Sequence, residues 1–434
     1  MKEWKDKFYV DIIKNEKISD ETEITFLAVE DMEKVKKFHQ SLDSYKRTPL
    51  VRLKSLAEKL KVKEILVKDE SYRFGLKAFK GLGGIYALSR VVCKKLGLNI
   101  EDISFSDLKS EEIREKISDM TFITATDGNH GKGVAWSAAQ LGCKAVVYMP
   151  KGSSETRAQA IRNIGDAEVT ITSMGYDDTV RFASKMSEEN GWYLVQDTSW
   201  EGYQEIPKWI IQGYTTMGAE AAEQMEEMEI EAPTHIFLQA GVGAMSGGIM
   251  GYLKNRYWKN KPVFAVAEPK EVACIYESAR VNDSEPHAAT GTGETIMAGL
   301  NCGEPCTVTW PILREYSDYY FSCPDFTAAK GMRMMANPIG KDRKIISGES
   351  GAVTLGITAL LLEKKELEDI KEDMKLNENS IILLFSTEGD TDPEVYKSII
   401  ENRQNIEPEK YMKGKSAYRY NPSYGFGKNG ERKS

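Results

Sequence analysis

The sequence predicts an α/β fold built from open, mostly parallel sheets that are covered by helices. Short apolar runs typical of buried strands alternate with helical stretches along the chain, as at residues 145–149 and 264–267. The 434 residues are enough for roughly two or three domains. Hydrophobic residues make up 41% of the chain and charged residues 29%, which are the proportions of a soluble globular protein.

The first candidate for chemistry along the chain is Lys77. It follows a predicted buried strand at residues 65–70 and precedes a predicted helix at residues 83–92. A lysine held among apolar groups loses solvation of its ammonium form, so its pKa falls. An amine that is partly neutral can form a Schiff base with an aldehyde. The ordinary alternative is a solvated lysine on a helix face.

A second motif contains Asp127, Gly128, Asn129 and His130. It lies between an apolar run at residues 122–125 and a helical stretch at residues 134–141. Such a turn presents backbone N–H groups at a helix N-terminus, which suits a carboxylate or a phosphate. Asn129 adds both a donor and an acceptor. A capped turn with glycines for tight geometry is the alternative interpretation.

The third motif is a glycine loop at residues 239–248. A predicted strand at residues 234–238 precedes it, and a helical stretch at residues 249–253 continues from it. Glycine lets backbone N–H groups approach a phosphate, and the helix dipole favours the negative charge. The full dinucleotide fingerprint is missing, and no Lys-Ser or Lys-Thr pair follows the glycines. Both facts argue against a nicotinamide cofactor or a nucleoside triphosphate.

One cofactor satisfies all three motifs, because pyridoxal 5′-phosphate offers an aldehyde, a phosphate and a phenolic oxygen. The sequence resembles the tryptophan synthase β-like, or fold type II, family of pyridoxal phosphate enzymes over roughly residues 45–395. Three further segments match that family in order: residues 47–53, 347–352 and 384–389. The resemblance implies an α/β structure with two open, mostly parallel sheets covered by helices.

The same resemblance implies two domains and a homodimer. The large domain is expected to comprise residues 1–91 and 221–434, and the small domain residues 92–220. The cofactor is expected in the cleft between them, since ligands prefer crevices at strand carboxyl ends.

Roles for individual residues also follow from the resemblance. It assigns the Schiff base to Lys77, the phenolic oxygen of the cofactor to Asn129, and the pyridine nitrogen to Ser386 or its neighbour Thr387. Glu349 is expected to be structural or to lie near the ring, and no chemistry is assigned to it. The expected phosphate cradle consists of Gly241, Val242, Gly243, Ala244 and Met245.

Departures from the family pattern narrow the range of expected substrates. Most relatives carry Ser-Phe-Lys or Ser-His-Lys at the cofactor lysine, whereas Gly75 and Leu76 precede Lys77 here. Asp127 stands where most relatives have serine, and Asp197 follows a further apolar run. These segments, with the glycine loop and residues 291–305, resemble members of the family that act on 2,3-diaminopropionate. Its second ammonium group suits two carboxylates, although either aspartate could instead serve a turn or a helix cap.

The implied reaction is α,β-elimination of D- and L-2,3-diaminopropionate to pyruvate and two ammonia. In this hypothesis Lys77 takes the Cα proton of the L form, Asp127 takes that of the D form, and Asp197 is the third catalytic residue. The alternatives are a threonine or serine dehydratase of the same fold and, further from the sequence pattern, a non-catalytic pyridoxal phosphate binding protein.

Composition excludes several other classes. The net charge of -8 argues against nucleic acid and anionic membranes as partners. No two of the six cysteines have metal-ligand spacing with a histidine nearby, so no metal is predicted. Reduced thiols and the lack of an apolar leader favour the cytoplasm, although a Cys274–Cys302 disulfide is compatible with the sequence. The polar tail from about Gly414 is expected to be partly disordered or docked through its aromatic side chains.

Overall fold

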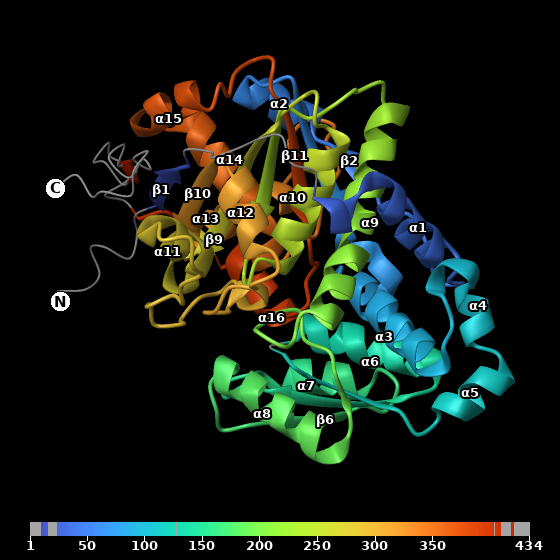
Figure 1. Ribbon diagram of the computed structural model, residues 1–434. Coiled ribbons are helices and arrows are strands. Elements are labelled where there is room, and N and C mark those ends of the chain that lie inside the picture. The colour runs from blue at the N-terminus through green and yellow to red at the C-terminus, as the bar shows by residue number, and fades with distance from the viewer. Residues whose placement is uncertain (1–9, 16–23, 127, 403, 409–417, 421–434) are drawn as a thin grey trace.

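The protein is described from a computed structural model, which places residues 10–15, 24–126, 128–402, 404–408 and 418–420. Two sheets of different size are joined by a group of packed helices (Figure 1). Apart from residues 418–420, the expected disorder or docking of the tail concerns residues outside this described part. The helices are α1 (Val29–Gln40), α2 (Lys54–Leu60), α3 (Gly81–Leu96), α4 (Phe105–Leu108), α5 (Glu111–Ile117), α6 (Asn129–Leu141), α7 (Glu155–Arg162), α8 (Tyr176–Asn190), α9 (Glu205–Glu227), α10 (Ala244–Arg256), α11 (Cys274–Val281), α12 (Trp310–Tyr316), α13 (Asp325–Ala336), α14 (Glu349–Glu363), α15 (Glu368–Asp373) and α16 (Pro393–Ile400), with short 3-10 turns at η1 (Thr25–Leu27), η2 (Glu70–Gly75), η3 (Ile100–Asp102), η4 (Lys270–Val272), η5 (Ala298–Leu300) and η6 (Lys365–Leu367).

The larger sheet is mixed but mostly parallel, as expected. Its described strands follow the spatial order β12-β1-β10-β9-β8-β11-β3-β2, and the pairs β1–β10 and β2–β3 are antiparallel. All residues of β3 and β8 are buried, because helices cover both faces of the sheet. The strands are β1 (Val10–Lys14), β2 (Leu50–Arg52), β3 (Glu64–Asp69), β8 (His235–Gln239), β9 (Val263–Pro269), β10 (Tyr319–Cys323), β11 (Ile381–Ser386) and β12 (Tyr418–Tyr420).

The smaller sheet is parallel throughout its described strands. They follow the order β6-β5-β4-β7, and α6, α7 and α8 connect them in sequence. In Figure 1 this unit occupies the bottom of the view. Its strands are β4 (Thr121–Ala125), β5 (Lys144–Met149), β6 (Glu168–Ile171) and β7 (Tyr193–Leu194). Two mostly parallel sheets covered by helices therefore confirm the predicted fold class.

The division into domains stays a prediction at the level of its boundaries. Every strand of the smaller sheet lies within residues 92–220, and every described strand of the larger sheet lies outside that range. The expected boundaries, however, fall inside two helices, after residue 91 in α3 and after residue 220 in α9. These two helices pack against each other, and α3 also packs on α6, so they belong to the junction between the sheets.

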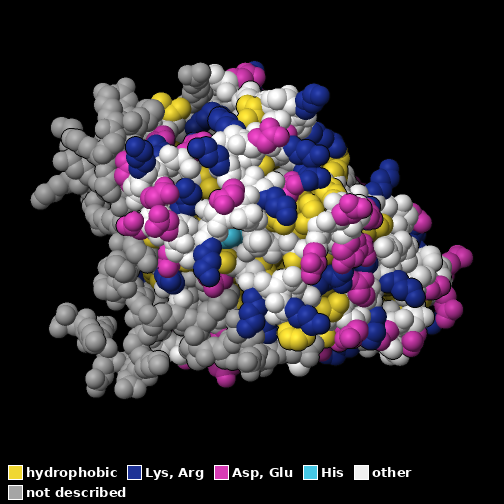
Figure 2. All heavy atoms as spheres, turned by 90° about the horizontal axis from the view of Figure 1, so that it is seen from above, with side chains coloured by type: hydrophobic (Ala, Val, Ile, Leu, Met, Phe, Trp, Pro, Cys, Tyr) yellow, Lys and Arg dark blue, Asp and Glu magenta, His cyan; other side chains and the backbone are white. Residues whose placement is uncertain are grey.

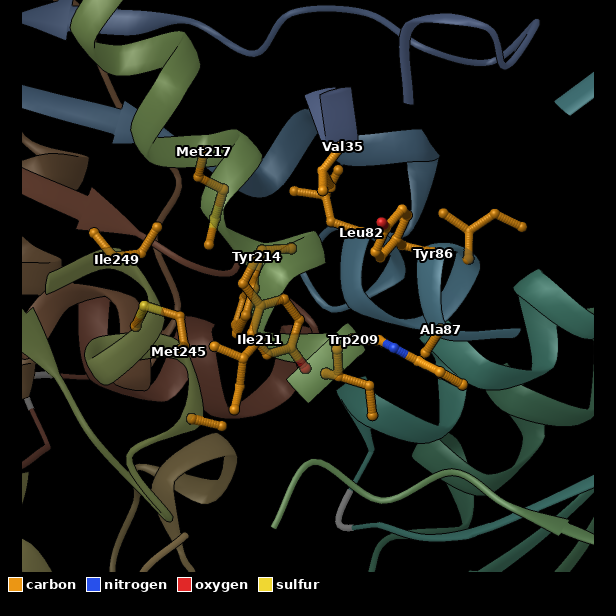
Figure 3. Packing of buried hydrophobic residues seen from close by; sticks show 14 of the residues in the cluster. Val35, Leu82, Tyr86, Ala87, Trp209, Ile211, Tyr214, Met217, Met245 and Ile249 are labelled. Atoms are coloured by element: carbon orange, nitrogen blue, oxygen red, sulfur yellow. The ribbon is translucent and has the colours of Figure 1, made fainter. Parts of the chain in front are cut away.

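The core of this junction is built around α9. Its side chains Ile211, Tyr214 and Met217 lie between α3 on one side and α10 on the other (Figure 3). Glycine permits the close approach of α3: a Cβ atom at Gly83 would lie 2.5 Å from the Tyr214 ring. The start of α3 is thereby held firmly against α9.

A buried ionic network fixes the segment that leads into α3. Lys68 donates to Glu220 at 2.6 Å, and Arg73 donates both to Glu220 and to Glu70 at 2.8 Å, with all four side chains fully buried. Burial alone would raise the pKa of Glu220, but Arg73 and Lys68 outweigh burial and hold that pKa at about 2. Removing one partner would leave an uncompensated buried charge, so this network is a rigid support for residues 74–80.

The described surface is polar and mixed in charge. Figure 2 shows lysine and arginine side chains interspersed with aspartate and glutamate on the face that it presents. None of the helices formed by the described residues combines the length and the apolar character needed to cross a membrane.

Candidate active site

The candidate active site is a cavity between the two sheets. It lies at the carboxyl ends of β8 and β11 in the larger sheet, and the start of α6 and the segment after β7 border it from the smaller sheet. Crevices at strand carboxyl ends are the usual ligand sites of α/β folds. The lining residues are Phe79, Lys80, Asn129, Asp197, Gln239, Ala240, Gly241, Val242, Gly243, Ala244, Met245, Ser246, Gly299, Leu300, Cys302, Ser350, Thr387 and Glu388.

The glycine loop forms one wall of this cavity, with all five residues of the expected phosphate cradle in the lining. The loop leaves β8 and enters α10, whose first-turn N–H groups have no partners within the helix. Gly243 has a φ of +90°, and a Cβ atom there would lie 2.7 Å from Leu313. A glycine-containing loop that leads into a helix N-terminus suits a phosphate group.

Lys77 lies outside the cavity, contrary to the expectation that apolar neighbours would desolvate it. Its side chain is 51% exposed, and its ammonium group pairs with Asp390 at 2.7 Å. Leu76 and Ala78 are buried, but the backbone at Lys77 has a φ of +58°, which directs the lysine differently from its neighbours. The prediction that Lys77 is buried is therefore wrong, because buried neighbours in the sequence do not fix the direction of its side chain.

Lys80 is the lysine that lines the cavity. Its Nζ atom donates a hydrogen bond to Oδ2 of Asp197 at 2.5 Å, and the two side chains are only 15% and 4% exposed. Sequence reasoning missed Lys80, although a signal was present. Ala78, Phe79 and Lys80 fit the Ser-Phe-Lys pattern of the family better than Gly75, Leu76 and Lys77 do.

Asp197 lies in the cavity as the sequence predicted, and it is ionised. Burial alone would raise its pKa, but the ammonium group of Lys80 and the nearby imidazole of His130 hold that pKa well below its usual range. Tyr214 also donates to Oδ2 at 3.3 Å. His130 is fully enclosed, so burial lowers its pKa, and its Nε2 atom is bound to the carbonyl of Val195 at 2.8 Å.

The asparagine turn faces the cavity from the smaller sheet. Asn129 begins α6 and donates from Nδ2 to Oε2 of Glu388 at 2.5 Å. Thr126 holds the turn, since its hydroxyl accepts the N–H groups of Gly128 at 2.9 Å and of Gly131 at 3.0 Å. Asp127 itself lies outside the described residues, so its role stays a prediction.

Thr387, not Ser386, is the hydroxyl that lines the cavity. Its Oγ1 atom accepts a hydrogen bond from Gln239 at 2.9 Å, whereas Ser386 is buried behind the lining. Oε1 of Gln239 is buried and has no donor among the described residues. An orphaned acceptor on a cavity wall is costly unless a bound molecule satisfies it.

Two further buried carboxylates lie near the cavity, and one of them, Glu388, lines it. Glu388 accepts from Asn129 and from the backbone of Ser350, and Glu349 lies beside it. Burial raises the pKa of Glu349 to about 8, and the negative charge of Glu388 is the second-largest cause of this rise. Sequence reasoning assigned Glu388 no role, because a single glutamate after a strand carries no distinctive pattern.

The residues present fit pyridoxal phosphate. The wall offers a primary amine at Lys80, the backbone of the glycine loop before α10, the amide of Asn129, and the hydroxyl of Thr387 beside an orphaned acceptor. These groups match an aldehyde, a phosphate, a phenolic oxygen and a pyridine ring. All six cysteines are free and buried, and no cluster of metal-ligating side chains occurs among the residues that the structure describes.

Comparison with known proteins points to the same cofactor. Residues 42–374 match the family described as pyridoxal-phosphate dependent enzyme. A diaminopropionate ammonia-lyase from Salmonella typhimurium is 50% identical over 366 residues, which are 84% of this chain and 90% of the relative. The solved structure of the holo Escherichia coli diaminopropionate ammonia lyase has a TM-score of 0.86 and 46% identity, and covers 92% of this chain and 99% of its own. The same enzyme in complex with D-serine has a TM-score of 0.85 and 46% identity, with 92% and 98% covered.

Proposed function

Because the chain belongs to the family of pyridoxal-phosphate dependent enzymes and its cofactor is pyridoxal 5′-phosphate, we propose that it acts as a diaminopropionate ammonia-lyase. The reaction is the elimination of D- and L-2,3-diaminopropionate to pyruvate and two ammonia, and the enzyme is a carbon–nitrogen lyase. About half of the residues are identical to those of the Salmonella relative along most of both chains, which supports this choice.

One observation carries the proposal: a single cavity brings Lys80, Asp197, Asn129 and the glycine loop together from four distant segments. Lys80 replaces Lys77 as the proposed covalent attachment point, since only Lys80 reaches the cavity. The backbone of Gly241, Val242, Gly243, Ala244 and Met245 would hold the phosphate, and Asn129 the phenolic oxygen. Thr387, rather than Ser386, would meet the ring nitrogen.

When bound, the cofactor withdraws electrons from Cα of the amino acid, so that its proton becomes removable. Residues of this chain then act as the bases that remove the proton. Lys80 is proposed to take the Cα proton of the L form from one face, and Asp127 that of the D form from the other. The β-amine leaves as ammonia, and the released enamine hydrolyses in water to pyruvate and the second ammonia.

Asp197 suits a substrate with a second cation. It is ionised, nearly fully buried and directed at the cavity, and in the described structure it is paired with Lys80. When the amine of Lys80 binds the cofactor, the buried carboxylate of Asp197 loses its ion-pair partner. The protonated β-amine of the substrate can then neutralise that carboxylate. A leaving amine must be protonated, so a carboxylate that keeps it charged also assists departure.

A threonine or serine dehydratase of the same fold is the second candidate. Its substrates carry a hydroxyl in place of the β-ammonium, which gives the buried Asp197 no second charge to balance. A non-catalytic pyridoxal phosphate binding protein would not require Asp197 in the cavity at all.

We further propose a cytoplasmic homodimer, on the basis of the family resemblance. Light scattering coupled to size-exclusion chromatography would give a mass near twice the 48.8 kDa of one chain. A monomeric mass would overturn the proposed assembly without affecting the proposed reaction.

The test of the function is an absorption spectrum of the purified protein with pyridoxal phosphate, followed by assays with each enantiomer of 2,3-diaminopropionate. We expect a visible cofactor band, and pyruvate and ammonia in a ratio of one to two from both enantiomers. Turnover of serine or threonine without turnover of diaminopropionate would establish the dehydratase instead. A cofactor band without any turnover would indicate a binding protein.

A further inference from the structure

We propose that His130 takes up the proton that Lys80 must lose before its amine can bind the cofactor, and that Asp197 joins the two residues. The inference deepens the proposed function and rests on it, because it requires Lys80 to be the covalent attachment point. His130 is a buried side chain that the proposed reaction leaves unused. It would be a positioning residue, since it acts on Lys80 through Asp197.

The imidazole of His130 has one satisfied and one orphaned nitrogen. Nε2 lies 2.8 Å from the carbonyl oxygen of Val195. A carbonyl oxygen can only accept, so Nε2 carries the hydrogen of the neutral ring and Nδ1 has a bare lone pair. Nδ1 is buried and has no hydrogen-bond partner among the described residues. His130 therefore places an unused base inside the protein.

The orphaned nitrogen faces the carboxylate of Asp197. Nδ1 lies 3.8 Å from Oδ2, which is just beyond hydrogen-bond distance. A bare lone pair and a carboxylate oxygen repel each other, whereas a protonated Nδ1 would donate to the same oxygen. At present Oδ2 accepts from Nζ of Lys80 at 2.5 Å and from the hydroxyl of Tyr214 at 3.3 Å. His130 is thus placed to replace Lys80 as the cationic partner of Asp197.

The basicity of His130 depends on the charge of Lys80. Burial is the largest cause that lowers the pKa of His130; the negative charge of Asp197 opposes it, and the positive charge of Lys80 adds to it. Among the described residues, these are the two charged side chains with a resolved effect on His130. If Lys80 becomes neutral, its contribution disappears and that of Asp197 stays, so the imidazole becomes a stronger base.

The proposed transfer keeps the buried charge constant. An ammonium group cannot attack an aldehyde, so one N–H bond of Nζ must break first. One N–H bond forms at Nδ1 in exchange, and Oδ2 lies between the two nitrogens as the contact of both. Lys80 and Asp197 are charged before the transfer, and His130 and Asp197 are charged after it. Without this exchange Asp197 would be left as an uncompensated buried charge, which is costly.

The first experiment measures the protonation of His130 in the cofactor-free protein. The chain has four histidines, so labelling histidine with nitrogen-15 gives few NMR signals. Those of His130 are identified by their loss in His130→Gln, or in His130→Asn if the first variant does not fold. The nitrogen shifts distinguish a bare ring nitrogen from a protonated one. At pH 7 we expect a neutral His130 in the parent and a doubly protonated His130 in Lys80→Met.

Three further variants test whether the charge of Lys80 acts through Asp197. Lys80→Arg keeps the cation, and Lys77→Met removes a lysine that is 51% exposed, so His130 should stay neutral in both. Adding Asp197→Asn to Lys80→Met removes the carboxylate and should make His130 neutral again. A neutral His130 in Lys80→Met, or a protonated one that persists after Asp197→Asn is added, would overturn the proposal.

The second experiment measures how fast the protein binds pyridoxal phosphate, from the growth of the visible cofactor band after mixing. His130→Gln should slow this step at least about tenfold at pH 7. The deficit should shrink as the pH rises, because hydroxide can then take the proton of Lys80. His287→Gln changes a partly exposed histidine and should keep the parent rate. Equal slowing at every pH would indicate a structural role alone and would overturn the proposal; thermal unfolding checks that each variant is folded.

The proposal and the proposed function fail separately. A protein that forms pyruvate from diaminopropionate, but keeps His130 neutral in Lys80→Met, retains the activity and loses the role of His130. A protein in which His130 responds to Lys80 as expected, but which forms no pyruvate, retains the role of His130 and loses the activity.

Discussion

Lys80 and Asp197 form a buried ion pair that joins the two sheet units: Nζ lies 2.5 Å from Oδ2, with the lysine at the start of α3 and the aspartate just after β7. Three residues earlier, Lys77 forms a similar pair with Asp390 at 2.7 Å, but at the exposed rim. The two pairs offer a matched comparison between a lysine inside the site and one outside it.

The first prediction concerns these pairs. Asp197→Asn should lower the free energy of unfolding of the cofactor-free protein by about 3–5 kcal/mol, because it leaves the buried charge of Lys80 uncompensated. Asp390→Asn removes an exposed partner and should cost less than about 1 kcal/mol. Urea unfolding of both variants measures the difference, and equal losses would show that the Lys80 pair is not the buried, coupled one.

Activity should separate the same variants. Asp197→Asn is expected to lower kcat/KM for diaminopropionate at least about 100-fold, since Asp197 contacts the cofactor lysine and faces the second amine. Asp390→Asn should stay within about twofold of the parent. A loss of activity confined to Asp390→Asn would instead favour Lys77 as the functional lysine.

Glu349 should make stability depend on pH. Burial and the charge of Glu388 raise its pKa from 4.5 to about 8, so the folded state binds more protons than the unfolded state between these values. Stability contributed by the neutral carboxyl is therefore complete below pH 4.5 and is lost as the pH rises towards 8. Glu349→Gln should flatten this decline by up to about 1.4 kcal/mol per pH unit.

Urea unfolding at pH 5, 6.5 and 8 tests this prediction. Glu366→Gln, which changes an exposed glutamate, should leave the decline as it is in the parent. Burial also raises the pKa of Glu268 to about 8. Part of the pH dependence of stability should therefore remain in every variant, because none of them changes Glu268. Parallel pH profiles for Glu349→Gln and the parent would show that Glu349 is ionised in the folded protein.

Gly243 should be needed for cofactor binding. Gly243→Ala combines a φ of +90° with a Cβ atom 2.7 Å from the Leu313 side chain, so the loop or the packed Leu313 must shift, and cofactor affinity should fall at least about tenfold. Gly202→Ala has a similar φ of +85° but nothing within 4 Å, so it should show backbone strain alone and keep the affinity. Fluorescence titration with pyridoxal phosphate compares the two, and equal affinities would argue against the cradle.

The hydroxyl of Thr387 should affect the spectrum and the activity of the bound cofactor. Thr387→Val removes a cavity-lining hydroxyl that accepts from Gln239, and should shift the absorption maximum of the bound cofactor and lower kcat up to about tenfold. Ser386→Ala changes a residue behind the lining and should alter neither quantity beyond about twofold. The reverse order of effects would return the role to Ser386.

Much of this architecture could be predicted from the sequence because the signals are local. The asparagine turn and Asp197 each follow an apolar strand of the smaller sheet, and the glycine loop follows one of the larger sheet. Within each sheet, parallel strands deliver their carboxyl ends to the same edge. These described elements meet in the one cavity between the two sheets.

The local sequence could not show whether Lys77 or Lys80 enters the cavity. Lys77 and Lys80 are three residues apart and share apolar neighbours, and their exposure depends on the backbone turn at Lys77 and on contacts with Asp390 and Asp197, more than 100 residues away. The pairing of Asn129 with Glu388 likewise depends on distant segments. Such contacts leave no periodic pattern in a single sequence.

Identifying the lysine that binds the cofactor covalently would decide between Lys80 and Lys77 as the centre of the proposed site. The protein loaded with pyridoxal phosphate is reduced with borohydride, digested, and the modified peptide is fragmented in a mass spectrometer so that Lys77 and Lys80 are read separately. We expect the phosphopyridoxyl group on Lys80, with Lys77 unmodified. Modification of Lys77 with Lys80 unmodified would contradict the proposed site.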